Sequence, residues 1–489
     1  MSIDFNHTWT VVTNGTPVLK SFEDEIINPD ISWYSPEGGS AQNPYILYDK
    51  DDLYGLALLS QDAENNGFAG KVIRLGADIV VNKGNAGDWT GCAPQYEWTP
   101  IGQETAFTGT FDGSDPETGE IHSISGLYLN TSSAYAGLFG QVKNPTNGTA
   151  VVQNVKLKNS YFVSSNLGLG SVIGNLNGGE VNNVYSNATV KSTGKGYVGG
   201  LIGAGKSTVQ LENCWFGGNV TNTGTTTSDR RTSGLLGCFS QGQLTMENCL
   251  NTATIDVSAH ASSNYPFVGA LVGVVGEDAA TTVTLTDCLN TGEIKVASAS
   301  TKYGGTVGYI RANANITVNT TYTDKSQCSR VYEYLDGGSY TVKGPNNEDW
   351  TITNVQISHD NIIGDVAKQN LQGFNFEKAW STVADGTPIL ACFASNVFVP
   401  DTTWYDGDSD TYILYNRADL YGLTELSRDN DFAGETIKLG ADIVINEGSA
   451  NKWGGYAPQY SWVPIGQTRA FAGTFDGSDP ETGEIHSIS

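Results

Sequence analysis

The chain has 489 residues, of which 39% are hydrophobic and 16% charged, and it contains 59 glycines. The apolar content is too high for a disordered chain, and the glycine content suits short strands joined by tight turns better than helices. The 52 acidic and 26 basic residues give a formal net charge of −26, which repels nucleic acids and anionic lipid headgroups. No apolar run reaches the roughly 18 residues needed for insertion into a membrane.

The N-terminal segment MSIDFNHTW has neither the basic region nor the apolar core of a secretory signal peptide. A strongly acidic surface keeps a long extracellular protein soluble. We therefore expect an exported parent protein, extracellular or attached to the cell wall, whose export signal lies outside this chain.

A long internal repeat divides the chain. Residues 109–125 are identical to residues 473–489, and the repeat unit spans roughly 365–370 residues. We predict the C-terminal tail of a preceding module at 1–29, a complete module at 30–395, and the truncated N-terminal part of the next module at 396–489. Shorter matches carry the same repeat: Asp52–Leu56 with Asp419–Leu423, Leu75–Val80 with Leu439–Val444, and Pro100–Gln103 with Pro464–Gln467.

The pattern that ends a module also occurs twice, as Trp9–Leu19 and Trp380–Leu390. The open end of a stack of strands needs a cover, since its backbone groups and apolar interior are otherwise unpaired. We expect each copy to bury its Trp against the lead-in of the following module, near Pro44–Tyr45 and Thr411–Tyr412. The segment 322–370, which breaks the shorter repeat described next, is predicted to be the end structure of the module.

Within the module, a Gly-Leu-x-Gly block recurs with its final glycines 29 to 36 residues apart. A second column follows each block, and a third apolar column lies six residues later. Three apolar strand positions per repeat, separated by polar turns, predict coils whose apolar faces are buried on their neighbours. We expect the block leucines to point inward. The columns consist of Leu138, Leu201, Leu235 and Leu271; Asn154, Asn183, Asn213, Asn248 and Asp287; and Val190, Val220, Ile255 and Ile294.

This pattern favours an all-β, right-handed parallel β-helix solenoid with about 30–36 residues per repeat and non-repeat end structures. An antiparallel β-sandwich, with strands every 8–12 residues, is the alternative, but it does not require a repeated triplet of motifs. Coordinates with mainly antiparallel pairing would reject the solenoid.

The Gly-Leu-x-Gly blocks, together with Trp98–Gly102, Phe107–Gly113 and Ile121–Ser125, resemble the GLUG-motif β-helix family of bacterial surface proteins. One departure is the insertion Ser114–Glu120, where the family pattern has a tight turn. The resemblance implies the β-helix fold and an origin in a large secreted or cell-wall protein. Because the family includes adhesins and noncatalytic parts of immunoglobulin A peptidases, it indicates fold more strongly than function.

Several motifs that suggest chemistry have simpler interpretations. Gly200–Ser207 matches the phosphate-binding pattern G-x-x-x-x-G-K-S, but it lies in a repeated block with no predicted helix after it. Three of the seven cysteines, Cys214, Cys249 and Cys288, share one column. We predict that these three are buried and reduced, with their sulfurs in a row, because stacked inward side chains do not readily give disulfide geometry.

The histidines lack metal-ligand spacing, and His122 and His486 occupy the same module position, which favours a role in stabilising a turn. The other histidines are His7, His260 and His359.

The acidic turn Asp112–Glu120, repeated as Asp476–Glu484, is either a cation-binding loop or a solvated turn. The aromatic residues Trp33, Tyr34, Trp89 and Tyr96 either stack on sugars or pack over the end of the solenoid.

Enzymes that cleave polysaccharides need a carboxylate pair, or carboxylates with calcium and a basic residue, along one groove. The acids of the repeat do not gather in one column. We therefore predict no catalytic, cofactor-binding or metal-binding residues, and a nonenzymatic stalk or adhesin module. Its partners are neighbouring modules of the same chain and glycans or proteins of a host or other microbes. The alternative is an accessory or glycan-binding region of a secreted peptidase or carbohydrate-active enzyme.

Overall fold

The computed structural model describes residues 9–10, 18–19, 27–84, 86–194, 196–224, 230–259, 267–296, 302–383, 386–396, 401–402, 404–445, 464–466, 469–480 and 482–489. The chain divides into two compact units, Met1–Cys392 and Phe393–Ser489, and each is considered by itself. Strands make up most of the regular structure that is described, so the fold is all-β.

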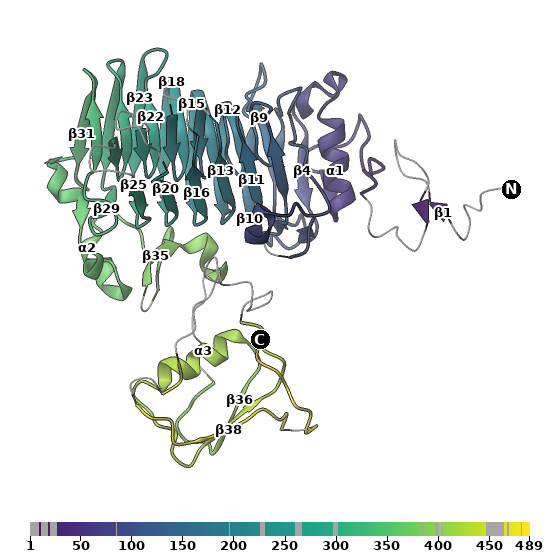
Figure 1. The fold of residues 1–489 in the computed structure, drawn as a ribbon, viewed down its shortest axis with the longest axis vertical. Helices are drawn as coiled ribbons and strands as arrows, with labels where there is room; N and C mark the ends of the chain where they lie inside the picture. Colours follow the sequence, from purple (N-terminus) through teal and green to yellow (C-terminus); the bar gives the residue numbers. More distant parts are fainter. Residues whose placement is uncertain are drawn as a thin grey trace. The chain divides into compact units, whose positions relative to one another are not determined.

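Most strands of unit 1 lie side by side in a stack (Figure 1). Those before the regular repeat are β3 (Tyr45–Leu47), β4 (Val72–Leu75), β5 (Ile79–Val80), β6 (Thr110–Asp112), β7 (Ser123–Ser125) and β8 (Tyr128–Thr131), with the short helices η2 (Ala63–Phe68) and η3 (Ala86–Thr90) between them. The regular repeat holds β9 (Phe139–Lys143), β10 (Val151–Lys158), β11 (Tyr161–Ser164), β12 (Ile173–Ser186), β13 (Thr189–Ser192), β14 (Gly196–Gly199), β15 (Ile202–Phe216), β16 (Asn219–Asn222), β17 (Arg230–Ser233), β18 (Leu236–Glu247), β19 (Leu250–Asn251), β20 (Thr254–Val257), β21 (Phe267–Gly269), β22 (Val272–Val275), β23 (Thr281–Thr286), β24 (Leu289–Asn290), β25 (Ile294–Val296), β26 (Lys302–Gly304), β27 (Val307–Ile310), β28 (Ala314–Asn319) and β29 (Tyr322–Asp324).

Most strands of the regular repeat pair in parallel with the strand one short repeat later. In β12 and β15, Ile173 lies opposite Ile202; in β15 and β18, Ile202 lies opposite Leu236. Long parallel sheets result, one of them in the order β25-β20-β16-β13-β11-β8 and another in the order β14-β17-β21-β26. Figure 1 shows β9, β12, β15 and β18 side by side. This parallel pairing is the opposite of what a sandwich of antiparallel strands requires.

The apolar columns form the core of unit 1. Leu138, Leu201, Leu235 and Leu271 are all fully buried, as predicted from the Gly-Leu-x-Gly blocks. In the third column, Val190 lies opposite Val220, which in turn pairs with Ile255. Stacking like residues in register removes each apolar side chain from water by placing it on its counterpart in the next repeat.

A corner column accompanies these apolar columns. Its residues have φ between 42° and 54°, a left-handed conformation that Asn and Asp tolerate better than most residues. The side-chain amide of Asn183 donates to Asn154 Oδ1, and that of Asn213 donates to Asn183 Oδ1, both at 3.0 Å. Asn therefore suits both the backbone of the bend and the contact between repeats. The corner column comprises Asn154, Asn183, Asn213, Asn248, Asp287 and Thr320.

Helix α1 (Lys50–Leu59) lies at the start of unit 1, beside β4 in Figure 1. The side chain of Asp49 caps the helix by accepting hydrogen bonds from two backbone N–H groups in its first turn. Leu53 and Leu56 are fully buried in the main core. The composition argued against helices, but this cap and its apolar side chains stabilise one at the end of the stack.

The segment 322–370 was predicted to be the end structure of the module, and this prediction was wrong for residues 332–343 and 356–357. Strands β30 (Tyr332–Leu335), β31 (Ser339–Lys343) and β33 (Gln356–Ile357) pair in parallel with β27, β28 and β29, so they add a further turn of strands. Only β32 (Asp349–Trp350), which pairs antiparallel with β31, and the following short helices depart from the pattern. Those helices are η4 (Ile352–Val355), η5 (His359–Asn361), η6 (Gly364–Val366) and α2 (Ala367–Asn370).

The pattern that ends a module forms an antiparallel hairpin of β34 (Trp380–Val383) and β35 (Gly386–Leu390), followed by η7 (Ala391–Asn396). Trp380 lies opposite Leu390 there, and in the first copy Trp9 of β1 (Trp9–Thr10) lies opposite Leu19 of β2 (Val18–Leu19). The two copies therefore share one strand register.

The position of Trp380 corrects a prediction. Its indole is fully buried in unit 1, where Nε1 donates to Asn248 Oδ1 at 3.2 Å and the ring stacks on Phe374 with centroids 4.5 Å apart. The tryptophan therefore packs on the corner column within unit 1. The comparison of the two junctions depends on residues 11–17 and 20–26, which lie outside the described residues.

Unit 2 repeats the beginning of unit 1. It contains β36 (Thr411–Leu414), α3 (Arg417–Leu426), β37 (Thr436–Leu439) and β38 (Thr474–Asp476), and its strands pair in parallel in that order. The cap of α3 is Asn416, which takes the place of Asp49.

Candidate functional site

The acidic turn between β6 and β7 is held by its own hydrogen bonds. Asp115 accepts from the backbone N–H groups of Glu117 and Thr118 at 2.8 and 2.7 Å, and from the Thr118 hydroxyl at 3.0 Å. Glu117 and Glu120 are exposed to solvent. Among the described residues, no group of three or more His, Cys, Asp or Glu side chains is placed to hold a metal ion. The arrangement is that of a solvated turn.

Asp112, at the start of this turn, is buried and makes contacts that join neighbouring strands. Its carboxylate accepts from Arg74 Nη2 at 3.1 Å and from the side-chain amides of Gln153 and Asn154 at 2.9 and 2.8 Å. Burial opposes ionisation, but hydrogen bonds from Asn154, Ser114 and Gln153 outweigh it and hold the pKa of this carboxyl below its usual range. Asp112 is therefore a charged acceptor for the amide of Asn154, the first residue of the corner column.

His122 lies between two carboxylates, with Nδ1 3.7 Å from Asp78 and Nε2 3.9 Å from Asp115. In unit 2 the same position, His486, lies 3.5 Å from Asp442 and 3.8 Å from Asp479. The same geometry in both units supports the interpretation of a turn-stabilising histidine.

His359 forms a separate contact with the buried Asp324, at 2.6 Å. His7 and His260 lie outside the described residues.

The cysteine ladder, Cys214, Cys249 and Cys288, is fully buried, and all three residues are free thiols. Val184 pairs with Cys214 in the preceding repeat, and the backbone N–H of Cys249 lies 3.4 Å from Cys288 Sγ. Burial raises the pKa of the Cys249 and Cys288 thiols well above the usual value. These groups therefore act as small apolar side chains, as predicted, and not as nucleophiles.

The phosphate-binding pattern at Gly200–Ser207 is part of strand structure. Most of it belongs to β15, which continues as a strand through Phe216, so no helix N-terminus follows the glycines. The Ser207 hydroxyl donates to Asn177 Oδ1 at 2.7 Å in the preceding repeat. The arrangement lacks the turn and helix that hold a phosphate.

Aromatic residues near the start of unit 1 pack against one another. Trp33 lies edge-on to Tyr45 with centroids 5.3 Å apart, and Tyr34 donates from its hydroxyl to Asn65 at 2.7 Å. Trp89 is buried against Tyr128. These contacts favour packing over sugar stacking, and Tyr96 likewise packs against the main core.

A lateral cluster outside the main core was not anticipated from the sequence. We use this name for the charged residues Arg231, Glu277 and Arg311 and the rings stacked on or beside them. Arg231 donates from Nε and Nη2 to the two carboxylate oxygens of Glu277 at 3.0 and 2.5 Å, and Arg311 donates to the same oxygens at 3.2 and 2.8 Å. One carboxylate thereby joins β17 to the turns after β22 and β27.

Aromatic rings pack on both guanidinium groups of the lateral cluster. The Arg231 guanidinium lies 5.0 Å from the Tyr197 ring centroid, and that of Arg311 lies 5.1 Å from the Tyr309 ring. Phe267 stacks on Tyr309 with centroids 4.2 Å apart. Burial opposes the charge of Arg231, yet the contacts with Glu277 outweigh it and raise the pKa of the guanidinium. These contacts hold the fully buried Arg231 in place and join three levels of the stack.

The sequence did not predict the lateral cluster because its residues do not recur from one repeat to the next. Tyr197, Arg231, Phe267 and Lys302 occupy one position in successive strands, and the four residue types differ. The only signal in the sequence was the run Asp229–Arg231, where two adjacent basic residues occur in a chain poor in them.

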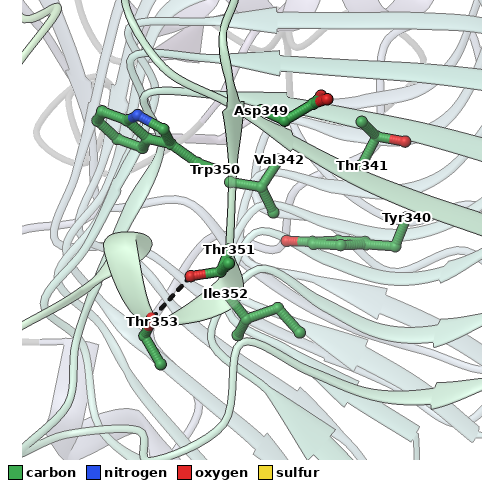
Figure 2. A pocket seen from close by; sticks show the side chains of 8 residues that line it. All are labelled: Tyr340, Thr341, Val342, Asp349, Trp350, Thr351, Ile352 and Thr353. Carbon is green, nitrogen blue, oxygen red and sulfur yellow. Dashed lines mark hydrogen bonds between the residues drawn. The ribbon is translucent and has the colours of Figure 1, made fainter.

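A pocket of about 490 Å³ lies at the far end of unit 1, where β31 meets β32 and η4 (Figure 2). The carboxylate of Asp349 pairs with Lys343 at 2.6 Å, and the indole of Trp350 donates to Glu348 at 3.0 Å. Asp349 supplies the carboxylate of this lining, which is otherwise made of hydroxyls and apolar groups. Such a lining suits a neutral polar ligand better than acid–base chemistry. It consists of Tyr340, Thr341, Val342, Asp349, Trp350, Thr351, Ile352 and Thr353.

Comparisons with known proteins give a partial similarity. The chain is 34% identical to halomucin of Haloquadratum walsbyi over 169 residues, which are 34% of this chain and 2% of halomucin. The chain thus matches a very small part of that protein's length. No protein-family description matches the chain, and no solved structure matches it. None of the helices in the described part of the chain is long and apolar enough to cross a membrane.

Proposed function

We propose that unit 1 is a right-handed parallel β-helix with about 30–36 residues per coil, and that it serves as a nonenzymatic structural module. The observation that carries this proposal is the register between repeats, in which Ile173, Ile202 and Leu236 stack in three successive strands. Coils that contact only their neighbours form a quasi-one-dimensional stack. Each coil adds about 4.8 Å of length, so the module acts as a rigid spacer.

The proposed location is the cell surface, in a large exported protein of the GLUG-motif type. The partial similarity to halomucin and the net charge of −26 support this location. The proposed partners are neighbouring modules, because the closing hairpin occurs in two copies with the same register.

Labelling of intact cells tests the location. Antibodies raised against residues 126–320 should bind cells of the source organism without permeabilisation, and external protease should remove the signal. Signal that appears only after permeabilisation contradicts the proposal. An antibody against a cytoplasmic protein serves as the control for cell integrity.

The pocket of Figure 2 favours a second role, the binding of neutral glycans, which would make the module an adhesin. A glycan array probed with the whole chain tests this role, with the variant Thr353→Val as a comparison, since it removes one lining hydroxyl and keeps the side-chain shape. Binding that Thr353→Val weakens supports the role, whereas equal binding by both proteins places the glycan elsewhere. Release of reducing ends from the bound glycans would contradict the nonenzymatic assignment.

A further inference from the structure

Unit 2 exposes apolar side chains along one face. Phe475 is 39% exposed and Ile488 44% exposed. Together with Leu420, Ile445 and Ile465 they line an apolar cavity of about 410 Å³. Contiguous apolar surface of this kind on a soluble protein usually marks a contact with another element.

Unit 1 contains the same residues in a covered state. Phe111, Ile124 and Ile101 correspond to Phe475, Ile488 and Ile465, and each of the three is fully buried. The sequences are identical over 109–125 and 473–489, so composition does not explain the difference in exposure.

Some equivalent positions do not differ in exposure between the two units. Val80 and Val444 are 50% and 44% exposed, and Tyr48 and Tyr415 are 57% and 56% exposed. These side chains meet solvent equally in both units. The greater exposure of Ile465, Phe475 and Ile488 is therefore not a general property of unit 2, and it indicates a neighbour that the face has in unit 1.

The element that covers this face in unit 1 is the coil of β9 and β10. The Phe139 ring lies 5.4 Å from that of Phe111, while Val152 pairs with Phe111 and Leu157 with Ile124 in parallel register. Polar contacts match as well, because the backbone N–H of Gly113 donates to the carbonyl of Gln153 at 2.9 Å.

The side chain of Asp112 in unit 1 is also less exposed than its counterpart Asp476 in unit 2. The Asp112 side chain is 9% exposed and receives the amides of Gln153 and Asn154. Its counterpart Asp476 pairs with Lys438 at 2.6 Å, as Asp112 does with Arg74, yet is 40% exposed. Both the apolar and the polar halves of the face thus fit the same occupant.

We propose that the face of unit 2 formed by Ile465, Phe475 and Ile488 is a docking surface for a coil with the residue pattern of 137–158. That pattern is a Gly-Leu-Phe-Gly block followed by Val-Val-Gln-Asn-Val-Lys-Leu, paired in parallel with β38 and with the strand position of Ile488. The proposal rests on the function proposed for unit 1 as a module in a tandem array, and it names the neighbour that unit 2 accepts. The backbone N–H and C=O groups of β38 supply the hydrogen bonds, as in other cases of strand addition to a sheet edge.

The test extends the whole chain after Ser489 with a copy of residues 126–392, since Ser489 is equivalent to Ser125. A matched control carries the same extension with the copies of Phe139, Val152 and Leu157 replaced by Ser. Hydrogen exchange of the backbone amides at 474–476 and 485–488 is measured in the unextended chain and in both extended chains. The unaltered extension is expected to slow exchange there by about tenfold or more, and the control extension is expected to slow it much less.

Two outcomes overturn the docking surface. One is equal exchange at 474–488 with both extensions. The other is strong protection in the unextended chain that depends on protein concentration, which would identify a second copy as the occupant. In either case, slow exchange in β12, β15 and β18 would leave the structural role of unit 1 standing, so the two proposals fail separately.

Discussion

Leu201, Leu235 and Leu271 occupy one interior position of successive repeats, whereas Tyr197, Arg231 and Phe267 occupy one position of the lateral cluster. At these three levels the interior position repeats one residue type, so each contact resembles the next. The lateral cluster has a different residue at each level and is held by contacts that occur once. The interior therefore provides a regular stack. The lateral cluster links the particular repeats that contain Arg231, Glu277 and Arg311.

The largest effect is expected from the cluster. Glu277→Ala leaves Arg231 buried with its guanidinium close to that of Arg311, and breaking a buried ion pair in this way costs about 3–5 kcal/mol. The free energy of unfolding in urea measures this loss, with the exposed Glu117→Ala as the control. A loss no larger than the control's would mean that the lateral cluster is dispensable. The double variant Arg231→Met with Glu277→Met should recover most of the stability, since it removes both charges.

The interior should respond to a cavity instead of an unpaired charge. Leu235→Ala removes a fully buried side chain between Leu201 and Leu271, with an expected loss of about 3 kcal/mol. The matched control is Leu167→Ala, because Leu167 is 37% exposed, and its loss should be under about 1 kcal/mol. Similar losses at the two positions would contradict the assignment of an interior column.

The corner column separates a backbone effect from a side-chain effect. Asn183→Ala places at φ of 53° a residue that tolerates this left-handed conformation less well than Asn, and it removes the hydrogen bonds to Asn154 and Asn213, at a cost of about 1–2 kcal/mol. Asn183→Gly relieves the backbone and keeps only the loss of hydrogen bonds. Thermal unfolding of the two variants should therefore rank Gly above Ala, and the reverse order would show that the left-handed conformation is unimportant.

Asp287 makes the corner column sensitive to pH. Burial raises its pKa to about 6, a hydrogen bond from Thr320 acts in the opposite direction, and Glu247 raises it further. A raised folded-state pKa means that the protonated form stabilises the fold, fully below the ordinary value near 3.8, and that this contribution is lost as pH rises through about 6. Asp287→Asn should therefore raise stability by about 1 kcal/mol at pH 7 and progressively less in acid. Melting temperatures at pH 4, 5, 6 and 7 test this, and a gain that does not change with pH would contradict it.

The smallest effect expected is the modification of the buried ladder cysteines by a thiol reagent in the native chain. Iodoacetamide should modify the exposed Cys92 in the native chain and leave the cysteine ladder unmodified. Mass spectrometry before and after denaturation measures both sets. Rapid native modification of Cys249 would mean that the interior opens far more readily than its stacking suggests.

The regular features of the fold were predictable because they repeat. The spacing of the Gly-Leu-x-Gly blocks indicated parallel neighbours, and the burial of Leu138, Leu201, Leu235 and Leu271 follows from it. The cysteine ladder was predictable for the same reason. A position that recurs in every repeat can be recognised by comparing the repeats of one chain with one another, so no second sequence is needed.

The remaining features depend on contacts that occur once. The extra turn of β30 and β31 has Tyr332 in the position of Val307 and lacks the glycine block, so its sequence did not match. Trp380 reaches Asn248 across 132 positions of sequence, a contact that no local pattern indicates. The lateral cluster likewise depends on Glu277 meeting Arg231 46 positions away.

The corner column also has a consequence for chemical ageing. Asparagine deamidates when the backbone nitrogen of the next residue attacks the side-chain carbonyl carbon, which requires a side chain free to rotate. Asn183 is held in place through its amide and its carbonyl oxygen by Asn154 and Asn213, so it resists the reaction. Asn147 precedes Gly148 in an exposed turn, where the attack is least hindered. Over a long lifetime, exposed turns of unit 1 such as the one at Asn147 would accumulate isoaspartate while the bends that hold its strands in register stay intact.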